Sequence, residues 1–133
     1  HDQSSAASDV YKRQLLLSVK DEMITQNLPF VNKNETMKEV VLKMTESRLG
    51  LALIGNEEKL EGIITDGDLR RSLLMSDDFT KIEIKDILNK SPMTAYENDN
   101  LQVAHERMKE ARLQSLVVKN NDEKIVGVIQ IFK

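Results

Sequence analysis

Apolar positions in the first half of the chain show first a helical spacing and then a strand spacing. Between residues 37 and 44, apolar side chains recur three and four positions apart, which predicts a helix with one buried face. Thr36, with Glu39 three residues later, forms a capping box at its start, and Gly50 is typical of its end. The apolar stripe consists of Met37, Val40, Val41 and Met44.

Two strands and a further helix are predicted after Gly50. The short apolar runs Leu51–Ile54 and Leu60–Ile64 are separated by a polar turn, which predicts paired strands. Beyond the second run, a helix is predicted through Leu69, Leu73 and Leu74.

The same order of elements returns about 64 residues later, which indicates an internal duplication. The matched pairs include Met37 with Leu101, Met44 with Met108, Leu49 with Leu113, and Gly62 with Gly127. In the second half, a helix is predicted through Leu101 and Ala111, followed by strands at Leu116–Val118 and Ile125–Ile129. No closing helix follows these strands before Lys133.

Each half also opens with a short helix-like piece, at 19–24 and 84–89, and an extended segment around Pro29 and Pro92. The predicted fold class is therefore α+β, with two tandem β-α-β-β-α units. One such unit buries too little apolar surface to be stable alone, so the units are expected to pack sheet to sheet with pseudo-two-fold symmetry.

The predicted division places the first unit at residues 13–80 and the second at residues 81–133. Residues 1–12 are polar, rich in serine and alanine, and without periodicity, so they are interpreted as a tail, a linker or an expression remnant.

Composition narrows the possible functions. The 133 residues are 40% hydrophobic and 31% charged, as in an ordinary globular protein, and the net charge of −3 argues against a nucleic-acid surface. No apolar run approaches the roughly 20 residues needed to span a bilayer, so no membrane contact is expected. Cysteine is absent and histidine occurs twice, which suits a cytoplasmic protein and excludes a histidine-rich metal site.

The segment Thr65–Arg71 reads Thr-Asp-Gly-Asp-Leu-Arg-Arg and lies where a strand stops and a helix is predicted to begin. Free backbone N–H groups at a helix start favour a phosphate, and Gly67 permits close approach to the backbone. The Thr65 hydroxyl can donate to a phosphate oxygen, and the Asp68 carboxylate can accept from both hydroxyls of a ribose. The pattern is consistent with a nucleotide or sugar-phosphate site.

Two other interpretations of this segment stay open. Asp66 could be the N-cap and Asp68 a favourable first-turn acid, with Arg70 and Arg71 on a solvated face and no ligand. Alternatively, Asp66 and Asp68 could bind magnesium in a phosphatase or transferase, which requires further acids from other loops.

The tandem β-α-β-β-α units, with Gly-Ile-Ile-Thr-x-x-Asp leading into a helix in the first, resemble a CBS domain pair over roughly residues 15–133. The run Thr-Asp-Gly-Asp-Leu-Arg-Arg and the segment Arg13–Ile24 are similar to the C-terminal region of D-arabinose 5-phosphate isomerases, whose catalytic sugar-isomerase (SIS) domain lies upstream. The same Asp-Gly-Asp-Leu-Arg-Arg run occurs in CBS pairs of some sugar nucleotidyltransferases.

The resemblance implies a role for each residue of the turn. Thr65 would contact a phosphate or a ribose hydroxyl, and Asp68 would hold the ribose diol. Asp66 and Gly67 would shape the turn.

It also implies contacts on either side of the turn. Arg70 or Arg71 would reach phosphates or a partner subunit. The backbone of Gly50, Leu51 and Ala52 would lie beside the base.

The second unit departs from this pattern, because Gln130 and Lys133 occupy the positions of Thr65 and Asp68. At most one nucleotide site per chain is therefore expected.

These observations predict a non-catalytic regulatory module of a sugar-phosphate isomerase of lipopolysaccharide or capsule synthesis. Its partners would be the upstream SIS domain, a second copy in a homodimer, and an adenine nucleotide or a cytidine nucleotide-sugar such as CMP-Kdo; no cofactor is required. Two alternatives are a structural oligomerisation module without ligand and the CBS pair of a sugar nucleotidyltransferase.

Overall fold

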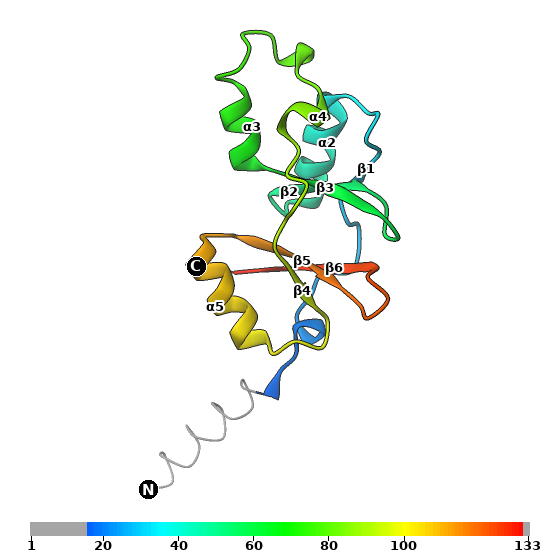
Figure 1. Cartoon of the computed structure of the whole chain (residues 1–133), viewed down its shortest axis with the longest axis vertical. Helices are drawn as coiled ribbons and strands as arrows, with labels where there is room; N and C mark the ends of the chain where they lie inside the picture. Colours follow the sequence, from blue (N-terminus) through cyan, green and yellow to red (C-terminus); the bar gives the residue numbers. More distant parts are fainter. Residues whose placement is uncertain (1–15, 132–133) are drawn as a thin grey trace, which may run out of the picture.

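The computed structural model describes residues 16–131 and shows two similar halves, one stacked on the other (Figure 1). The first half contains β1 (Phe30–Val31), α2 (Met37–Ser47), β2 (Leu51–Gly55), β3 (Leu60–Thr65), α3 (Asp66–Ser72), the 3-10 helix η2 (Phe79–Lys81) and α4 (Ile84–Ile87). The second contains β4 (Thr94–Tyr96), α5 (Leu101–Ala111), β5 (Ser115–Lys119) and β6 (Ile125–Gln130). A 3-10 helix, η1 (Val19–Asp21), precedes them.

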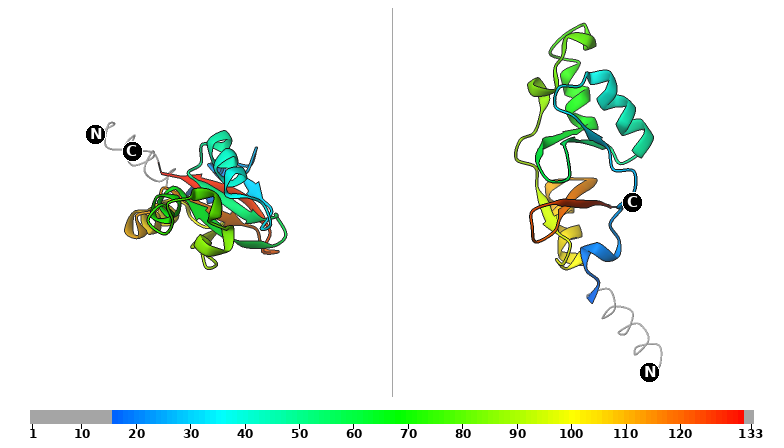
Figure 2. Two further views of the ribbon diagram at one scale, coloured as in Figure 1. Left: turned by 90° about the horizontal axis from the view of Figure 1, so that it is seen from above. Right: turned by 90° about the vertical axis from the view of Figure 1, so that its right-hand side faces the viewer.

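Each half is built on a three-stranded sheet with the same topology. The strand orders are β1-β2-β3 and β4-β5-β6, with the first pair parallel and the second antiparallel in both sheets. The two sheets face each other, and α2 and α5 lie on their outer sides (Figures 1 and 2). The predicted α+β fold, with two units packed sheet to sheet, is confirmed.

Alternation along the strands produces this layering. In β2, Leu51 and Leu53 point to the interface between the sheets, whereas Ala52 and Ile54 point to the helices of the first half. The interface core joins side chains of both halves: Leu49, Leu51, Leu53, Ile63, Val117, Ile125 and Val128. Because these apolar side chains are removed from water only when the halves associate, the pairing of the units is itself a source of stability.

Helices α2 and α5 end in the same way. The end of α2 lies two residues before Gly50, where the sequence predicts it. The C-caps are Arg48 and Arg112, both left-handed with φ of 58°. Gly50 also has positive φ, at 73°, but it serves the turn into β2. The expected helix end at Gly50 is therefore wrong: Arg48 takes the left-handed position that glycine usually occupies.

Helix α3 is shorter than the leucine spacing predicts. It ends at Ser72, whose side chain is fully buried and donates a hydrogen bond to the Leu69 carbonyl oxygen at 2.5 Å. Leu69 packs against the core of the first half, whereas Leu73 and Leu74 are exposed. The prediction that the helix continues through Leu73 and Leu74 is wrong, because no apolar surface in the described part of the chain lies against these two side chains.

The segments that lead into each half cross to the opposite half. Ile24 pairs with Val128 of β6, and Asn89 pairs with Ile63 of β3, each by two backbone hydrogen bonds of 2.8–3.0 Å. Val19 belongs to the core of the second half, and Ile82 and Ile84 belong to that of the first. The chain thus crosses between the stacked sheets twice, which ties the halves together.

Candidate functional site

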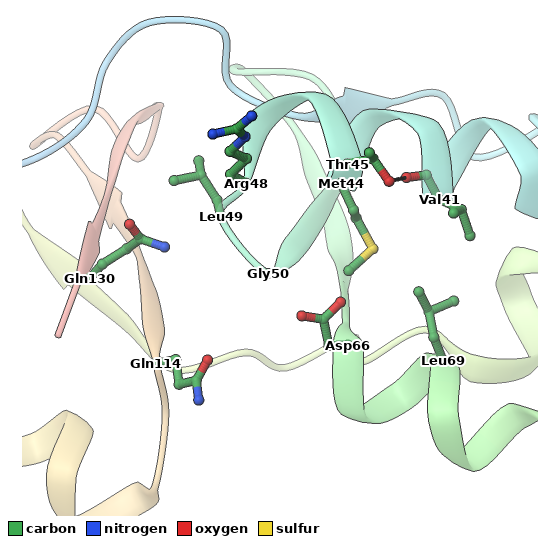
Figure 3. A pocket seen from close by; sticks show the side chains of 10 residues that line it. All are labelled: Val41, Met44, Thr45, Arg48, Leu49, Gly50, Asp66, Leu69, Gln114 and Gln130. Carbon is green, nitrogen blue, oxygen red and sulfur yellow. Dashed lines mark hydrogen bonds between the residues drawn. The ribbon is translucent and has the colours of Figure 1, made fainter. Parts of the chain in front are cut away.

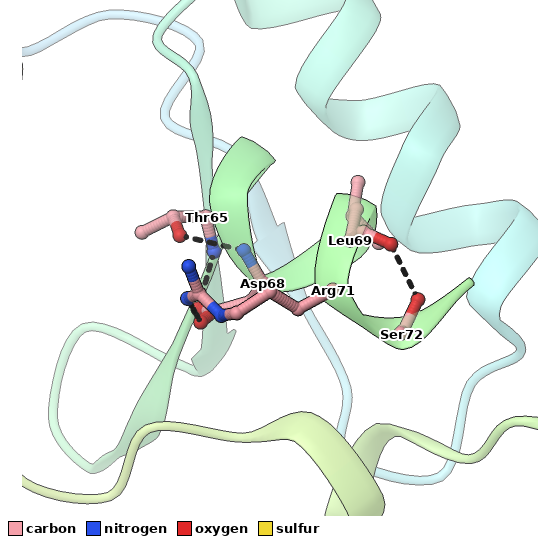
Figure 4. A network of polar contacts seen from close by, with 5 residues as sticks. All are labelled: Thr65, Asp68, Leu69, Arg71 and Ser72. Carbon is pink, nitrogen blue, oxygen red and sulfur yellow. Dashed lines mark hydrogen bonds and ion pairs between the residues drawn. The ribbon is translucent and has the colours of Figure 1, made fainter. Parts of the chain in front are cut away.

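The candidate site is built around the junction of β3 and α3. Thr65 is the N-cap: its Oγ1 accepts from the Asp68 amide at 3.1 Å, and the Asp68 Oδ2 accepts from the Thr65 amide at 2.9 Å (Figure 4). This reciprocal capping box satisfies two backbone donors at the helix start. The interpretation of Asp66 as the N-cap is therefore wrong by one residue, since Asp66 is the first residue of the helix.

Asp68 has a second partner on its own helix. Arg71 folds back and donates from Nη2 to the Asp68 Oδ1 at 2.5 Å (Figure 4). The Asp68 side chain is 18% exposed and that of Arg71 70% exposed, so the guanidinium lies on the solvent side of the carboxylate. Both oxygens of Asp68 thus accept hydrogen bonds within the turn.

Asp66 points in another direction. Its amide donates to the Gly50 carbonyl oxygen at 3.1 Å, and its carboxylate lies between Gly50 and the end of α2 (Figure 3). A Cβ added at Gly50 would be 3.4 Å from the Asp66 Oδ2. Asp66 and Asp68 therefore do not converge as a metal-binding pair, and within residues 16–131 no group of three or more potential ligands is gathered.

A cavity of about 480 Å³ lies in front of this junction, between the two halves. We call it the cleft cavity. Its lining from the first half is Gly50, Leu51, Thr65, Asp66, Gly67, Arg70 and Arg71, and from the second half Ala111, Arg112, Leu113, Gln114 and Ser115. The volume is within the range of small-molecule sites.

Most of the residues that the sequence singles out therefore meet at one cavity. Asp68 does not line it directly, because Arg71 covers its carboxylate. Ala52 does not line it either: it is fully buried, and its side chain belongs to the outer core of the first half.

A smaller cavity of about 340 Å³ adjoins the cleft cavity and shares Gly50, Asp66 and Gln114 with it (Figure 3). Gln130 lines it at the position that matches Thr65, since Gln130 pairs with Ser115 as Thr65 pairs with Leu51. The Gln130 Nε2 donates to the Ser115 hydroxyl at 3.4 Å, so an amide stands here where the first half has the Thr65 hydroxyl.

Sequence reasoning did not identify the contribution of the second half to the cleft cavity. Arg112, Gln114 and Ser115 line it, and the Ser115 hydroxyl donates to the Leu49 carbonyl oxygen at 2.6 Å across the halves. The alignment of the two repeats could have indicated this contribution, because Arg112 and Gln114 match Arg48 and Gly50.

The charge of the cleft cavity is locally positive although the chain carries −3. Arg70, Arg71 and Arg112 line it, against Asp66 in the lining and Asp68 behind it. Helix α3 has only seven residues, so these arginines, rather than a helix dipole, favour an anionic ligand. An arginine can bind a phosphate with two parallel hydrogen bonds, which suits a phosphorylated ligand.

A larger cavity, of about 610 Å³, lies in the first half between the start of α2 and the segment 80–88. It contains none of the residues predicted for a site. Its charges are mixed, with Lys85 paired to Glu83 at 3.2 Å, an interaction that raises the pKa of Lys85. This cavity has no residue from the strands β4–β6 or the helix α5 of the second half.

Comparison with known sequences agrees with this architecture. The sequence matches the family model of the CBS domain at residues 19–75 and 84–131. It is 38% identical over 119 residues to a probable arabinose 5-phosphate isomerase of Haemophilus influenzae and 33% identical over 121 residues to the arabinose 5-phosphate isomerase KpsF of Escherichia coli. These matches cover 89% and 90% of the chain, but the chain spans 35% and 37% of those relatives.

Solved structures share the fold. The CBS domain protein PAE2072 of Pyrobaculum aerophilum, complexed with AMP, superposes with a TM-score of 0.74 at 23% identity, covering 86% of this chain and 87% of that one. The CBS domain pair of protein MJ0100, in complex with 5-methylthioadenosine and S-adenosyl-L-methionine, gives 0.73 at 22% identity, covering 86% and 90%. Among residues 16–131, no helix combines the length and apolarity that crossing a membrane requires.

Proposed function

The chain belongs to the CBS domain family, and from that premise we propose that it is a regulatory pair that binds a nucleotide or nucleotide-sugar in the cleft cavity. Thr65 would donate to a phosphate or ribose hydroxyl, and Asp68 would accept from the ribose diol. Asp66 and Gly67 would shape the turn, and Gly50 and Leu51, which line the cleft cavity, would lie near the base. Binding between the halves would alter how they pack and so act on the rest of the protein.

One observation carries this proposal: the cleft cavity draws its lining from both halves and is rich in arginine. A ligand there contacts Gly67 on one side and Ser115 on the other, so its binding energy depends on how the two sheets are placed. The larger cavity in the first half has neither property.

The relatives support a proposal about the parent protein. We infer that the chain is the non-catalytic CBS pair of a cytoplasmic, homodimeric arabinose 5-phosphate isomerase, and that an SIS domain performs the chemistry elsewhere in that protein. An adenine nucleotide is one candidate ligand, since PAE2072, which shares the fold, is complexed with AMP. A cytidine nucleotide-sugar such as CMP-Kdo suits a module that responds to a product of the pathway.

A thermal-shift and calorimetric screen of the 133-residue chain tests the proposal. The panel is AMP, ATP, CMP, CMP-Kdo, S-adenosylmethionine and arabinose 5-phosphate. A ligand at 100 times its Kd adds about 2.7 kcal/mol to the free energy of unfolding, which raises the melting temperature measurably. We expect a shift with at least one nucleotide and a loss of about tenfold or more in affinity in Asp68→Asn.

Asp86→Asn is the matched control. Asp86 occupies the same third position in the capping box of α4, where its Oδ2 accepts from the Glu83 amide at 3.0 Å, and it does not line the cleft cavity. Equal loss of affinity in Asp68→Asn and Asp86→Asn would count against a ligand role for Asp68, since both changes disturb a helix start.

A structural module without ligand is the second candidate, and the observed capping box favours it. The oxygens of Thr65 and Asp68 already accept hydrogen bonds within the turn, so helix stability alone accounts for both residues. The absence of a shift with every member of the panel would support this candidate. A nucleotide-selective shift would contradict it.

A further inference from the structure

The contact between Arg71 and Asp68 sets a condition on any ligand of the cleft cavity. Arg71 Nη2 donates to Asp68 Oδ1 at 2.5 Å, while the Asp68 Oδ2 is held by the Thr65 amide. A Cβ added at Gly67 would be 3.2 Å from Arg71 Nη1, so the guanidinium lies directly over the turn. While Arg71 stays there, its guanidinium covers the solvent side of the Asp68 carboxylate and hinders the approach of a ribose diol.

A phosphate offers Arg71 another partner within the same cavity. Arg71 is 70% exposed and its ion pair with Asp68 is on the surface, so little is lost when the guanidinium swings away. A phosphate carries more negative charge than one carboxylate and accepts two parallel hydrogen bonds from a guanidinium. A nucleoside lacks any such group and leaves Arg71 in place.

We propose that Arg71 is a specificity-determining residue: it covers Asp68 until a ligand phosphate draws it away, so the cleft cavity binds nucleotides more tightly than nucleosides. This inference rests on the proposed function and names the class of ligand for that site. Arg112, which reaches the cavity from the end of α5, adds a phosphate contact from the second half without touching Asp68.

The test compares nucleotides with their nucleosides. NMR titrations of the 133-residue chain with AMP, adenosine, CMP and cytidine measure weak and strong binding on one scale. In the wild type, at least one nucleotide is expected to bind about tenfold or more tightly than its nucleoside. In Arg71→Gln, the nucleotide binds more weakly and the nucleoside more tightly, because Asp68 is uncovered.

Two further variants separate this role from a simple phosphate contact. Arg112→Gln is expected to lower the affinity for the nucleotide about tenfold and to leave the affinity for the nucleoside unchanged. Lys109→Gln removes the same charge from an exposed position on α5 that does not line the cleft cavity, and it should change neither.

Each remaining outcome overturns the inference in a recognisable way. If Arg71→Gln lowers the affinity for the nucleotide but does not raise the affinity for the nucleoside, Arg71 contacts the phosphate without covering Asp68. If wild type binds AMP and adenosine, or CMP and cytidine, equally well, the proposed function stands and the selectivity claim fails. If none of the four binds and no nucleotide or nucleotide-sugar of the wider panel raises the melting temperature, the proposed function fails as well.

Discussion

At the residue scale, partners close in sequence decide what each side chain of the candidate site can do. Asp68 has a helix-capping bond and an ion pair, whereas Asp66, two positions earlier, faces Gly50 and the end of α2. Two carboxylates that look equivalent in the sequence therefore differ in their surroundings and partners. The rotation of about 100° per helical residue explains why they diverge.

A hydrogen bond far from the cleft gives a test in terms of pH. The Tyr96 hydroxyl donates to the Glu123 Oε1 at 2.5 Å, and this bond, with a smaller contribution from Lys119, lowers the pKa of Glu123 below its ordinary value of 4.5. Because the folded pKa is lowered, the interaction stabilises the protein above that ordinary pKa. The stabilisation is lost as the pH falls through the folded value.

Tyr96→Phe is therefore expected to raise the Glu123 pKa toward 4.5, measured by NMR titration of the side-chain carboxyl. The variant should be less stable than the wild type near neutral pH, and the difference in free energy of unfolding should narrow in acid. A Glu123 pKa that is the same in both proteins would contradict the assignment.

At the element scale, the matched glycines of the two halves mark where lead-in segments cross the last strands. A Cβ at Gly62 would collide with the Asn89 carbonyl oxygen, and one at Gly127 would be 2.8 Å from the Ile24 carbonyl oxygen. Both obstacles are backbone atoms that cannot move independently. The glycines thus permit the two crossings that join the halves.

Gly62→Ala is expected to lower the free energy of unfolding by roughly 1–3 kcal/mol, since the added methyl group forces the Asn89 segment away. Chemical denaturation measures the change. Gly67→Ala is the control, because its nearest obstacle is the flexible end of Arg71 at 3.2 Å and alanine favours a helix. Equal destabilisation by both substitutions would show that the crossing is not what requires glycine at residue 62.

The helices and strands were largely predictable, because the spacing of apolar residues is a local signal and the internal repeat presents it twice. The stripe Met37–Met44 and the apolar runs in each half correctly predicted α2, α5 and the paired strands. The crossings were not predictable, since nothing in residues 19–24 shows that they pack on the second half. The predicted end of α3 was wrong for a related reason. The leucines repeat at helical spacing, but whether they are buried depends on surfaces that are distant in the sequence.

At the scale of the whole molecule, stacking the two halves creates the site. The turn Thr65–Arg71 was recognisable in the sequence, yet five of the twelve residues that line the cleft cavity come from residues 111–115. These residues carry no ligand motif of their own. Tertiary packing, with the sheets joined through a shared core and the Ser115–Leu49 hydrogen bond, brings Arg112 opposite the turn.

The central claim is that a nucleotide binds between the halves, and amide hydrogen exchange of the 133-residue chain with saturating AMP or CMP tests it most directly. We predict slower exchange in two separate segments, Thr65–Arg71 and Arg112–Ser115, at the same ligand concentration. Protection confined to residues 33–37 and 80–88 would instead place the ligand in the larger cavity of the first half. That result, or exchange that is unchanged with both nucleotides, would contradict the account.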